Sequence, residues 1–273
     1  MLLRDVGYAR PSTLDAALGA LAADDGARAL AGGQTLINVM KARAASPDVL
    51  IDLRDLAELK GIELAADGTL TIGAMTTYTE LIASSEARAR PILVDVCSQI
   101  ADVQVRNRGT LGGNICSNDP TNHLPPLMVA VGASMTIVGA AGTREVSAEE
   151  FFLGVYMTAV GTGELLTKIT LPAGRADGFA AVTLGADGTC LVNVAASLED
   201  GIRIAIGCVD AVPVLVQPAS TDAEAIRAAV RAAELDPPAD VHATTEYRLH
   251  LAEVLAVRAV EQAVEQAANR ARS

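Results

Sequence analysis

Two glycine-rich segments constrain this chain more than any other feature of its sequence. Residues 31–35 read AGGQT and residues 109–114 read GTLGGN, and each lies beside an apolar stretch typical of a buried strand. Paired glycines permit φ > 0 and a close approach of the backbone, so successive N–H groups can point into one concavity. Such a concavity suits a pyrophosphate. Nearby hydroxyl and amide groups suit phosphate and sugar oxygens, and they belong to Gln34, Thr35, Thr110 and Asn114.

Each segment taken alone also fits an ordinary tight turn. Neither matches G-x-x-x-x-G-K-[ST] or G-x-G-x-x-G, so the usual P-loop and Rossmann sites are not indicated. The residues by themselves therefore predict two candidate anion-binding loops and leave the ligand open.

The overall charge narrows the classes of partner. The 273 residues carry 21 basic and 33 acidic side chains, a net charge of −12, and only 3% aromatic residues. This balance argues against nucleic acid and anionic membranes as partners, since both require a basic surface. The apolar fraction of 51% indicates a globular protein, and the length suits one large domain or two ordinary ones.

The cysteines and histidines show no metal-ligand spacing. Cys97, Cys116, Cys190 and Cys208 are isolated in the sequence, which favours buried thiols in a reducing cytoplasm. No Ser/His/Asp set is present, so we expect no catalytic residue and no metal site in this chain. Residues 120–143 lack charged side chains, but glycines interrupt them. They predict a short buried helix and then a strand, not an integral membrane segment.

The pattern of the elements predicts two regions of α+β character. Up to about residue 175 we expect a β-α-β opening with Ser12 as an N-cap, an Asp-Gly hairpin and several helices. One of these helices is expected to start at Asp119-Pro120. After a linker at 173–178 we expect a three-stranded antiparallel meander and two helices. The segments expected in this second region are strands 179–184, 190–198 and 202–209, turns 186–188 and 199–201, and helices 222–233 and 247–268.

Four segments, in this order, resemble the FAD-binding subunit of molybdenum hydroxylases. That family includes the medium subunit of aerobic carbon monoxide dehydrogenases and the flavin domain of xanthine dehydrogenase. The resemblance covers nearly the whole chain. The four segments are AGGQTLINVMKARAASPDVLIDL (31–53), VRNRGTLGGNICSNDPTNHLPPLMVAVGA (105–133), GELLTKITLP (163–172) and ADVHATTEYRLHLAEVLAVRAVEQA (239–263).

The resemblance implies a two-subdomain FAD-binding fold of the vanillyl-alcohol-oxidase type over residues 1–175, with subdomains at about 1–55 and 56–175. A small α/β domain over 176–273, a three-stranded antiparallel sheet plus helices, would follow. FAD would lie extended between the two subdomains.

Site residues carry over by position. The first loop, whose N–H groups would hold the pyrophosphate, comprises Leu30, Ala31, Gly32, Gly33, Gln34, Thr35 and Leu36. The second comprises Thr110, Gly113 and Asn114, with Cys116 and Ser117 following on a strand. Asn122 and His123 would lie close to the cofactor, Ile100 and Ala101 would flank its adenine half, and Leu166 would pack near the flavin ring.

The sequence departs from the family pattern at two places. His123 stands where the family often has an acidic residue that binds a cofactor hydroxyl, and Phe179–Gly185 lacks the basic residue common there. Both departures bear on flavin affinity, potential or choice of acceptor.

The role implied by the resemblance is that of an oxidoreductase component. As the FAD-binding electron-transfer subunit, the chain would accept electrons from iron-sulfur clusters in a small partner subunit and pass them to an external acceptor. A large partner subunit would carry the molybdenum cofactor, and the family implies a cytoplasmic heterohexamer. Two alternatives stay open: a stand-alone flavin reductase or oxidase of the same fold, and a structural subunit with a vestigial flavin site. Neither the substrate nor the acceptor is predicted.

Overall fold

The computed structural model describes residues 3–174, 176–185 and 189–270, and it opens with a small parallel sheet. Strands β1 (Gly7–Ala9), β2 (Ala27–Leu30) and β3 (Val49–Asp52) pair in the order β1-β3-β2. Helices α1 (Leu14–Ala22) and α2 (Leu36–Lys41) connect them. The N-cap of α1 is Thr13 rather than the expected Ser12, because the Thr13 hydroxyl accepts the Ala16 N–H. The β-α-β prediction is otherwise confirmed.

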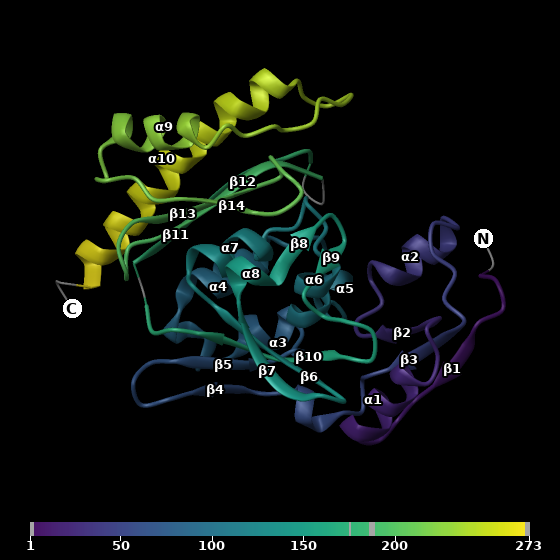
Figure 1. The fold of residues 1–273 in the computed structure, drawn as a ribbon. Coiled ribbons are helices and arrows are strands. Elements are labelled where there is room, and N and C mark those ends of the chain that lie inside the picture. The colour runs from purple at the N-terminus through teal and green to yellow at the C-terminus, as the bar shows by residue number, and fades with distance from the viewer. Residues whose placement is uncertain (1–2, 175, 186–188, 271–273) are drawn as a thin grey trace.

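A five-stranded antiparallel sheet lies beside the small parallel sheet (Figure 1). Its order is β4 (Ile62–Leu64), β5 (Leu70–Gly73), β10 (Leu165–Leu171), β6 (Ser134–Gly139) and β7 (Gly142–Ser147). The expected hairpin is confirmed: β4 pairs with β5 around Gly68, whose φ of +88° only glycine adopts readily. Helices cover one face and share its apolar core: α3 (Tyr78–Ala83), α4 (Pro91–Gln99), α6 (Leu111–Ser117) and α7 (Leu124–Ala130).

Shorter elements complete this region: the 3-10 turns Ala57–Leu59 and Ala87–Ala89, helices α5 (Val103–Arg106) and α8 (Ala148–Phe151), and the hairpin β8 (Phe152–Gly154) and β9 (Met157–Thr158). Helix α7 followed by strand β6 confirms the buried helix and strand expected within 120–143. Across the described residues, no helix combines the length and the apolar character that a membrane span requires.

The second glycine segment runs directly into helix α6, so the expectation that Cys116 and Ser117 follow on a strand is wrong. The helix forms because its first N–H groups all find acceptors. The Leu111 N–H donates to the Thr76 carbonyl and the Gly112 N–H to the Ala74 carbonyl. The Gly113 N–H donates to the Thr110 hydroxyl at 3.1 Å. Two of these three acceptors come from a segment that the local sequence does not reveal.

The helix start expected at Asp119-Pro120 is also wrong. Helix α7 begins at Leu124, with His123 in the N-cap position and prolines in its first turn. The Asp119 carboxylate instead accepts hydrogen bonds from both the N–H and the hydroxyl of Thr121, at 2.9 and 2.8 Å. These bonds close a turn two residues long, which competes with a helix at this point.

The C-terminal region contains a four-stranded antiparallel sheet, not the expected three-stranded one. Its order is β11 (Asp177–Thr183), β12 (Cys190–Ser197), β13 (Arg203–Gly207) and β14 (Val214–Val216). The three predicted strands are confirmed. Strand β14 was not predicted, because a strand of three residues is too short to show a periodic pattern. Helices α9 (Ala223–Ala232) and α10 (Thr245–Arg270) pack on one face, while α7 lies against the other (Figure 1).

The linker expected at 173–178 is only partly a linker. Its last two residues, Asp177 and Gly178, already belong to strand β11. The linker residue Arg175 and the turn expected at 186–188 lie outside the described residues.

A buried ion pair fastens the C-terminal sheet to the preceding region. The Arg90 guanidinium, at the start of α4, donates through Nε and Nη2 to the two carboxylate oxygens of Asp177, each at 2.9 Å. Arg90 also donates to the Pro172 carbonyl and the Ser197 hydroxyl. The side chains of Arg90 and Asp177 are 2% and 0% exposed. Two parallel charge-assisted bonds fix both the distance and the orientation of the two side chains. The pair therefore holds the start of strand β11 against the start of helix α4.

Removing one partner of this pair should destabilise the protein strongly. Asp177→Ala leaves a buried guanidinium without its carboxylate, and we expect a loss of about 3–5 kcal/mol in the free energy of unfolding. The double variant Arg90→Met with Asp177→Leu should lose less of its free energy of unfolding, since no buried charge remains. Urea unfolding followed by circular dichroism measures both. Asp55→Asn is the control, because Asp55 belongs to an exposed ion pair with Arg10, and this variant should change the free energy of unfolding little. An Asp177→Ala variant as stable as Asp55→Asn would contradict this role.

Candidate functional site

The two glycine segments meet in space. A Cβ atom placed on Gly32 would lie 2.1 Å from the carbonyl oxygen of Arg108 and 2.9 Å from the Cα of Gly109. A Cβ on Gly113 would lie 3.4 Å from the Cβ of Ala31. The backbones therefore touch at a point where no larger residue than glycine fits at position 32. The contact brings strand β2 of the parallel sheet next to helix α6.

The first loop presents N–H groups that the protein itself does not use. Within the part of the chain that the structure describes, the N–H groups of Gly32, Gly33, Gln34 and Thr35 donate no hydrogen bond. The second loop differs, because the N–H groups of Leu111, Gly112 and Gly113 are bonded inside the protein. These three N–H groups of the second segment are therefore not available to a ligand, and the contact of that segment with an anion stays a prediction. Only residues 32–35 leave adjacent donors available to a ligand.

A cavity of about 340 Å³ adjoins these donors. Its size is in the range of small-molecule sites. Three basic side chains line it together with the loop, although the chain as a whole is acidic. The lining residues are Leu30, Ala31, Gly32, Gly33, Gln34, Ile37, Asn38, Lys41, Arg54 and Arg108.

The three basic residues are functional candidates that the sequence reasoning missed. Lys41 ends helix α2, Arg54 follows strand β3, and Arg108 precedes the second glycine segment. The sequence offered one signal, a basic residue near each glycine segment: Lys41 after the first and Arg108 before the second. Only the packing of the chain shows that these two residues and Arg54 surround one cavity. Together with the N–H groups they form a site for an anion.

The position of Arg54 is set by a buried carboxylate. Asp52 is fully buried at the end of β3 and accepts the Tyr8 hydroxyl at 2.6 Å and the Arg54 N–H at 3.0 Å. The oxygen that accepts the Tyr8 hydroxyl, Oδ2, also lies 2.7 Å from the Arg54 Nε. The hydrogen bond to Asp52 also raises the pKa of Tyr8, so this hydroxyl stays a donor. Since Asp52 neutralises part of the charge on Arg54, Lys41 and Arg108 contribute most to the positive field of the cavity.

Helix α6 and the turn after it bring three more predicted residues together. The Asn122 amide donates to the Asn114 carbonyl at 3.3 Å and to the Ser117 hydroxyl at 3.2 Å. The side-chain oxygen of Asn114 is buried and has no hydrogen-bond partner among the described residues. A buried acceptor without a donor is unfavourable, so a ligand hydroxyl or amide at this position would stabilise it.

His123 lies at the junction with the C-terminal sheet. Its Nδ1 is 3.1 Å from the Asn193 amide nitrogen, and its ring centroid is 5.3 Å from that of Phe179 on β11. The two departures from the family pattern are thus neighbours, because the His123 ring packs against Phe179, the first residue of the segment that lacks a basic residue.

The remaining predicted residues lie in separate places. The carbonyls of Ile100 and Ala101 both accept from the Arg106 guanidinium, which holds this turn beside helix α5. Leu166 is buried on β10, where it pairs with Ile137. Cys116 lies on α6, where burial raises the pKa of its thiol to about 12. None of Ile100, Ala101, Cys116 and Leu166 lines the 340 Å³ cavity, so their contacts with a cofactor stay predictions.

Comparisons with known proteins give a consistent result. Residues 4–174 match the family model described as "FAD binding domain in molybdopterin dehydrogenase". The carbon monoxide dehydrogenase medium chain of Afipia carboxidovorans is 38% identical, over 96% of this chain and 98% of that protein. The xanthine dehydrogenase FAD-binding subunit of Escherichia coli O157:H7 is 30% identical, over 94% and 95%.

A solved structure agrees with these two relatives. The carbon monoxide dehydrogenase of Oligotropha carboxidovorans, in its reconstituted form, contains a chain that superposes with a TM-score of 0.90 at 34% identity. The match covers 97% of this chain and 100% of that one.

The contact between the two loops should tolerate no side chain on Gly32. Gly32→Ala places a methyl group against the Arg108 backbone, which cannot rotate away. Overpacking of this kind costs about 1–3 kcal/mol of stability. Gly19→Ala is the matched control, since a Cβ there meets nothing within 4 Å in helix α1. It should stabilise by about 0.5–1 kcal/mol because alanine favours the helix. Thermal unfolding compares the two, and a Gly32→Ala variant of unchanged stability would contradict the contact.

Proposed function

This chain belongs to the family of FAD-binding domains of molybdopterin dehydrogenases, and on that premise we propose that it is an electron-transfer subunit. It is an FAD-binding oxidoreductase component, comparable to the medium subunits of molybdenum hydroxylases. The proposal adds a direction of transfer: this chain would hold the FAD that receives electrons from iron-sulfur clusters in a small partner subunit and supplies them to an external acceptor.

The observation that carries this proposal is the set of unused N–H donors of Gly32 to Thr35 beside a basic cavity. We assign this loop, with Lys41 and Arg108, to the pyrophosphate of FAD. The orphan oxygen of Asn114 would accept a hydroxyl of the cofactor. Asn122, which bonds both Asn114 and Ser117, would hold that end of the site in place.

The flavin itself supplies the redox chemistry, because when bound it can take up electrons singly and release them in pairs. The protein binds, orients and shields it. This division of labour accounts for a site made of amides, hydroxyls and cations, in which no acid-base pair lines the described cavity.

The proposed assembly contains a large molybdenum subunit and a small iron-sulfur subunit, two copies of each with two of this chain. The relatives' names as medium chains and FAD-binding subunits support an assembly of several subunits. The four cysteines are free thiols, which suits the reducing cytoplasm in which we place the complex.

The assignment of the loops predicts a charge-dependent loss of flavin. The double variant Gly33→Asp with Gly113→Asp places one carboxylate in the assigned loop and a second next to Ala31, where a Cβ on Gly113 would lie 3.4 Å from the Ala31 Cβ, so we expect it to lose FAD. The control variant Gly33→Asn with Gly113→Asn has side chains of the same shape without the charge, so it should keep more FAD. Asparagine also tolerates the φ of +73° at position 33. Flavin absorbance after desalting, normalised to folded protein, measures both. A folded double Asp variant with full flavin content would overturn the assignment.

The direction of transfer can be tested in the assembled complex, purified through a tag on this chain. It should contain flavin, iron, acid-labile sulfide and molybdenum. Carbon monoxide, purines, aldehydes and N-heterocycles serve as candidate reductants. With the active one, a complex carrying the double Asp variant should still bleach its iron-sulfur absorbance but should lose reduction of an external dye. Dye reduction at the wild-type rate without flavin would refute the proposal. Oxidation of a substrate by this chain alone would favour a stand-alone flavoenzyme.

A further inference from the structure

A second polar cluster lies away from the glycine loops, between helix α7 and the C-terminal sheet. Its centre is Asn193, which is fully buried on β12 opposite Gly207 of β13. The Asn193 amide nitrogen lies 3.5 Å from the sulfur of Cys190 and 3.5 Å from the sulfur of Cys208. The same nitrogen is 3.1 Å from Nδ1 of His123. The cluster thus gathers two thiols and an imidazole around one amide.

The two thiols touch each other. Cys190 begins β12, and Cys208 follows β13 with a φ of +66°, which turns the chain at the end of that strand. Their side chains hydrogen-bond directly. Both sulfurs also contact the same Asn193 nitrogen atom, so the two thiols lie in one cluster at the ends of neighbouring strands.

The surroundings make Cys190 a nucleophile. The hydrogen bond from Cys208, assisted by His123, lowers the pKa of the Cys190 thiol to about 6 in spite of burial. The same bond raises the pKa of Cys208, which remains the proton donor. Cys97 differs, because burial alone raises the pKa of its thiol to about 12. Reactivity of cysteine follows the thiolate, so the chain contains one activated thiol next to a partner thiol.

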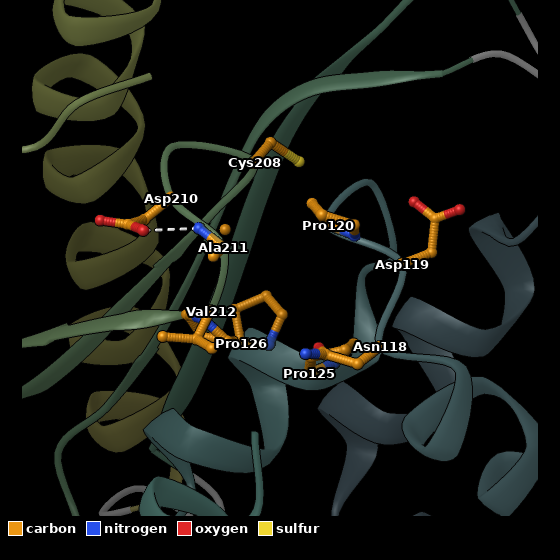
Figure 2. Close-up of a pocket in the computed structure, with 11 residues that line it drawn as sticks. Asn118, Asp119, Pro120, Pro125, Pro126, Cys208, Asp210, Ala211 and Val212 are labelled. Carbon is orange, nitrogen blue, oxygen red and sulfur yellow. Dashed lines mark hydrogen bonds between the residues drawn. The ribbon is translucent and has the colours of Figure 1, made fainter. Parts of the chain in front are cut away.

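A small cavity adjoins Cys208, on one side of the pair, and Cys190 does not line it. Its volume is about 10 Å³, which is room for one water-sized molecule. Cys208 lines it together with Asp119, Pro120, Pro126 and Val212, and Figure 2 shows the sulfur pointing toward Pro120. A molecule as small as hydrogen peroxide could occupy such a space after slight widening, whereas a protein thiol or a large disulfide could not.

The arrangement does not favour a metal. Among the described residues, no group of three or more histidine, cysteine, aspartate or glutamate side chains is placed to hold a metal ion. The side-chain oxygen of Asn193 is buried without a hydrogen-bond partner in the same set of residues.

We propose that Cys190 and Cys208 form a peroxide-reactive dithiol that closes reversibly to a disulfide between the ends of β12 and β13. The Cys190 thiolate attacks one oxygen of hydrogen peroxide, the O–O bond breaks, and the released hydroxide takes a proton and leaves as water. Cys208 then attacks the sulfur of the resulting sulfenic acid. The S–O bond breaks, the S–S bond forms, and the Cys208 proton leaves with the hydroxyl group as a second water. The site needs no flavin, so it stands independently of the proposed electron transfer.

The test uses the full chain with and without FAD. Hydrogen peroxide is added, removed with catalase, and the remaining thiols are alkylated in denaturant for peptide mapping. We expect one cross-linked peptide pair joining Cys190 to Cys208, lighter by two hydrogen atoms and restored by dithiothreitol. Cys97 and Cys116 are internal controls, and the Cys190 thiol should disappear at least about tenfold faster than either. This mapping of the unmodified chain requires no variant to fold.

Two variants separate the roles of the sulfurs. Cys208→Ser should leave Cys190 as a sulfenic acid that dimedone traps, and Cys190→Ser should give neither a disulfide nor a dimedone adduct on Cys208. Cys97→Ser is the matched control and should form the disulfide as the unmodified chain does. The proposal is overturned if Cys190 and Cys208 stay as alkylatable as Cys97. It is equally overturned if the same disulfide forms as fast in urea as in the folded chain.

Discussion

The site depends on the direct contact of two backbones, Gly32 against Arg108 and Gly109. A backbone-to-backbone approach this close needs a residue without a Cβ, and it brings the parallel sheet within reach of helix α6. The contact also explains why the two glycine segments behave differently. The N–H groups of Leu111 and Gly112 in the second segment donate to the carbonyls of Thr76 and Ala74, while those of Gly32 to Thr35 in the first donate to no described residue. On the proposed assignment, the second segment supports the site and the first binds the cofactor.

The C-terminal sheet is tied to this site by two kinds of interaction. The Arg90–Asp177 pair fixes strand β11 where it leaves the first region. Phe179, Ala195 and Ala205 of the sheet share one apolar core with helix α7. His123, at the start of α7, therefore contacts both Phe179 and Asn193. Hydrogen bonds continue this connection to helix α6, since the Asn193 amide donates to the Asn122 carbonyl and the Asn122 amide donates to the Asn114 carbonyl.

The similarity to known proteins agrees with a site that binds a cofactor, and it does not indicate one substrate. Two relatives that are similar over nearly their whole length are named for carbon monoxide and for xanthine, which are very different molecules. A subunit kept over such a change of substrate has a role that does not depend on the substrate. The described site has the same character, with donors and cations for an anionic cofactor.

The sequence by itself determined the periodic elements and the family. Helical and alternating patterns located α9, α10 and strands β11 to β13, the Asp-Gly turn located the β4–β5 hairpin, and ordered motifs identified the FAD-binding family. Tertiary structure alone decided that residues 111–117 form a helix, since the acceptors for its first N–H groups include carbonyls of a distant segment. It also decided that Lys41, Arg54 and Arg108 share one cavity and that Cys190 meets Cys208. The physical reason is that periodicity reports which face of an element is buried, whereas the partner of that face is chosen by packing across the chain.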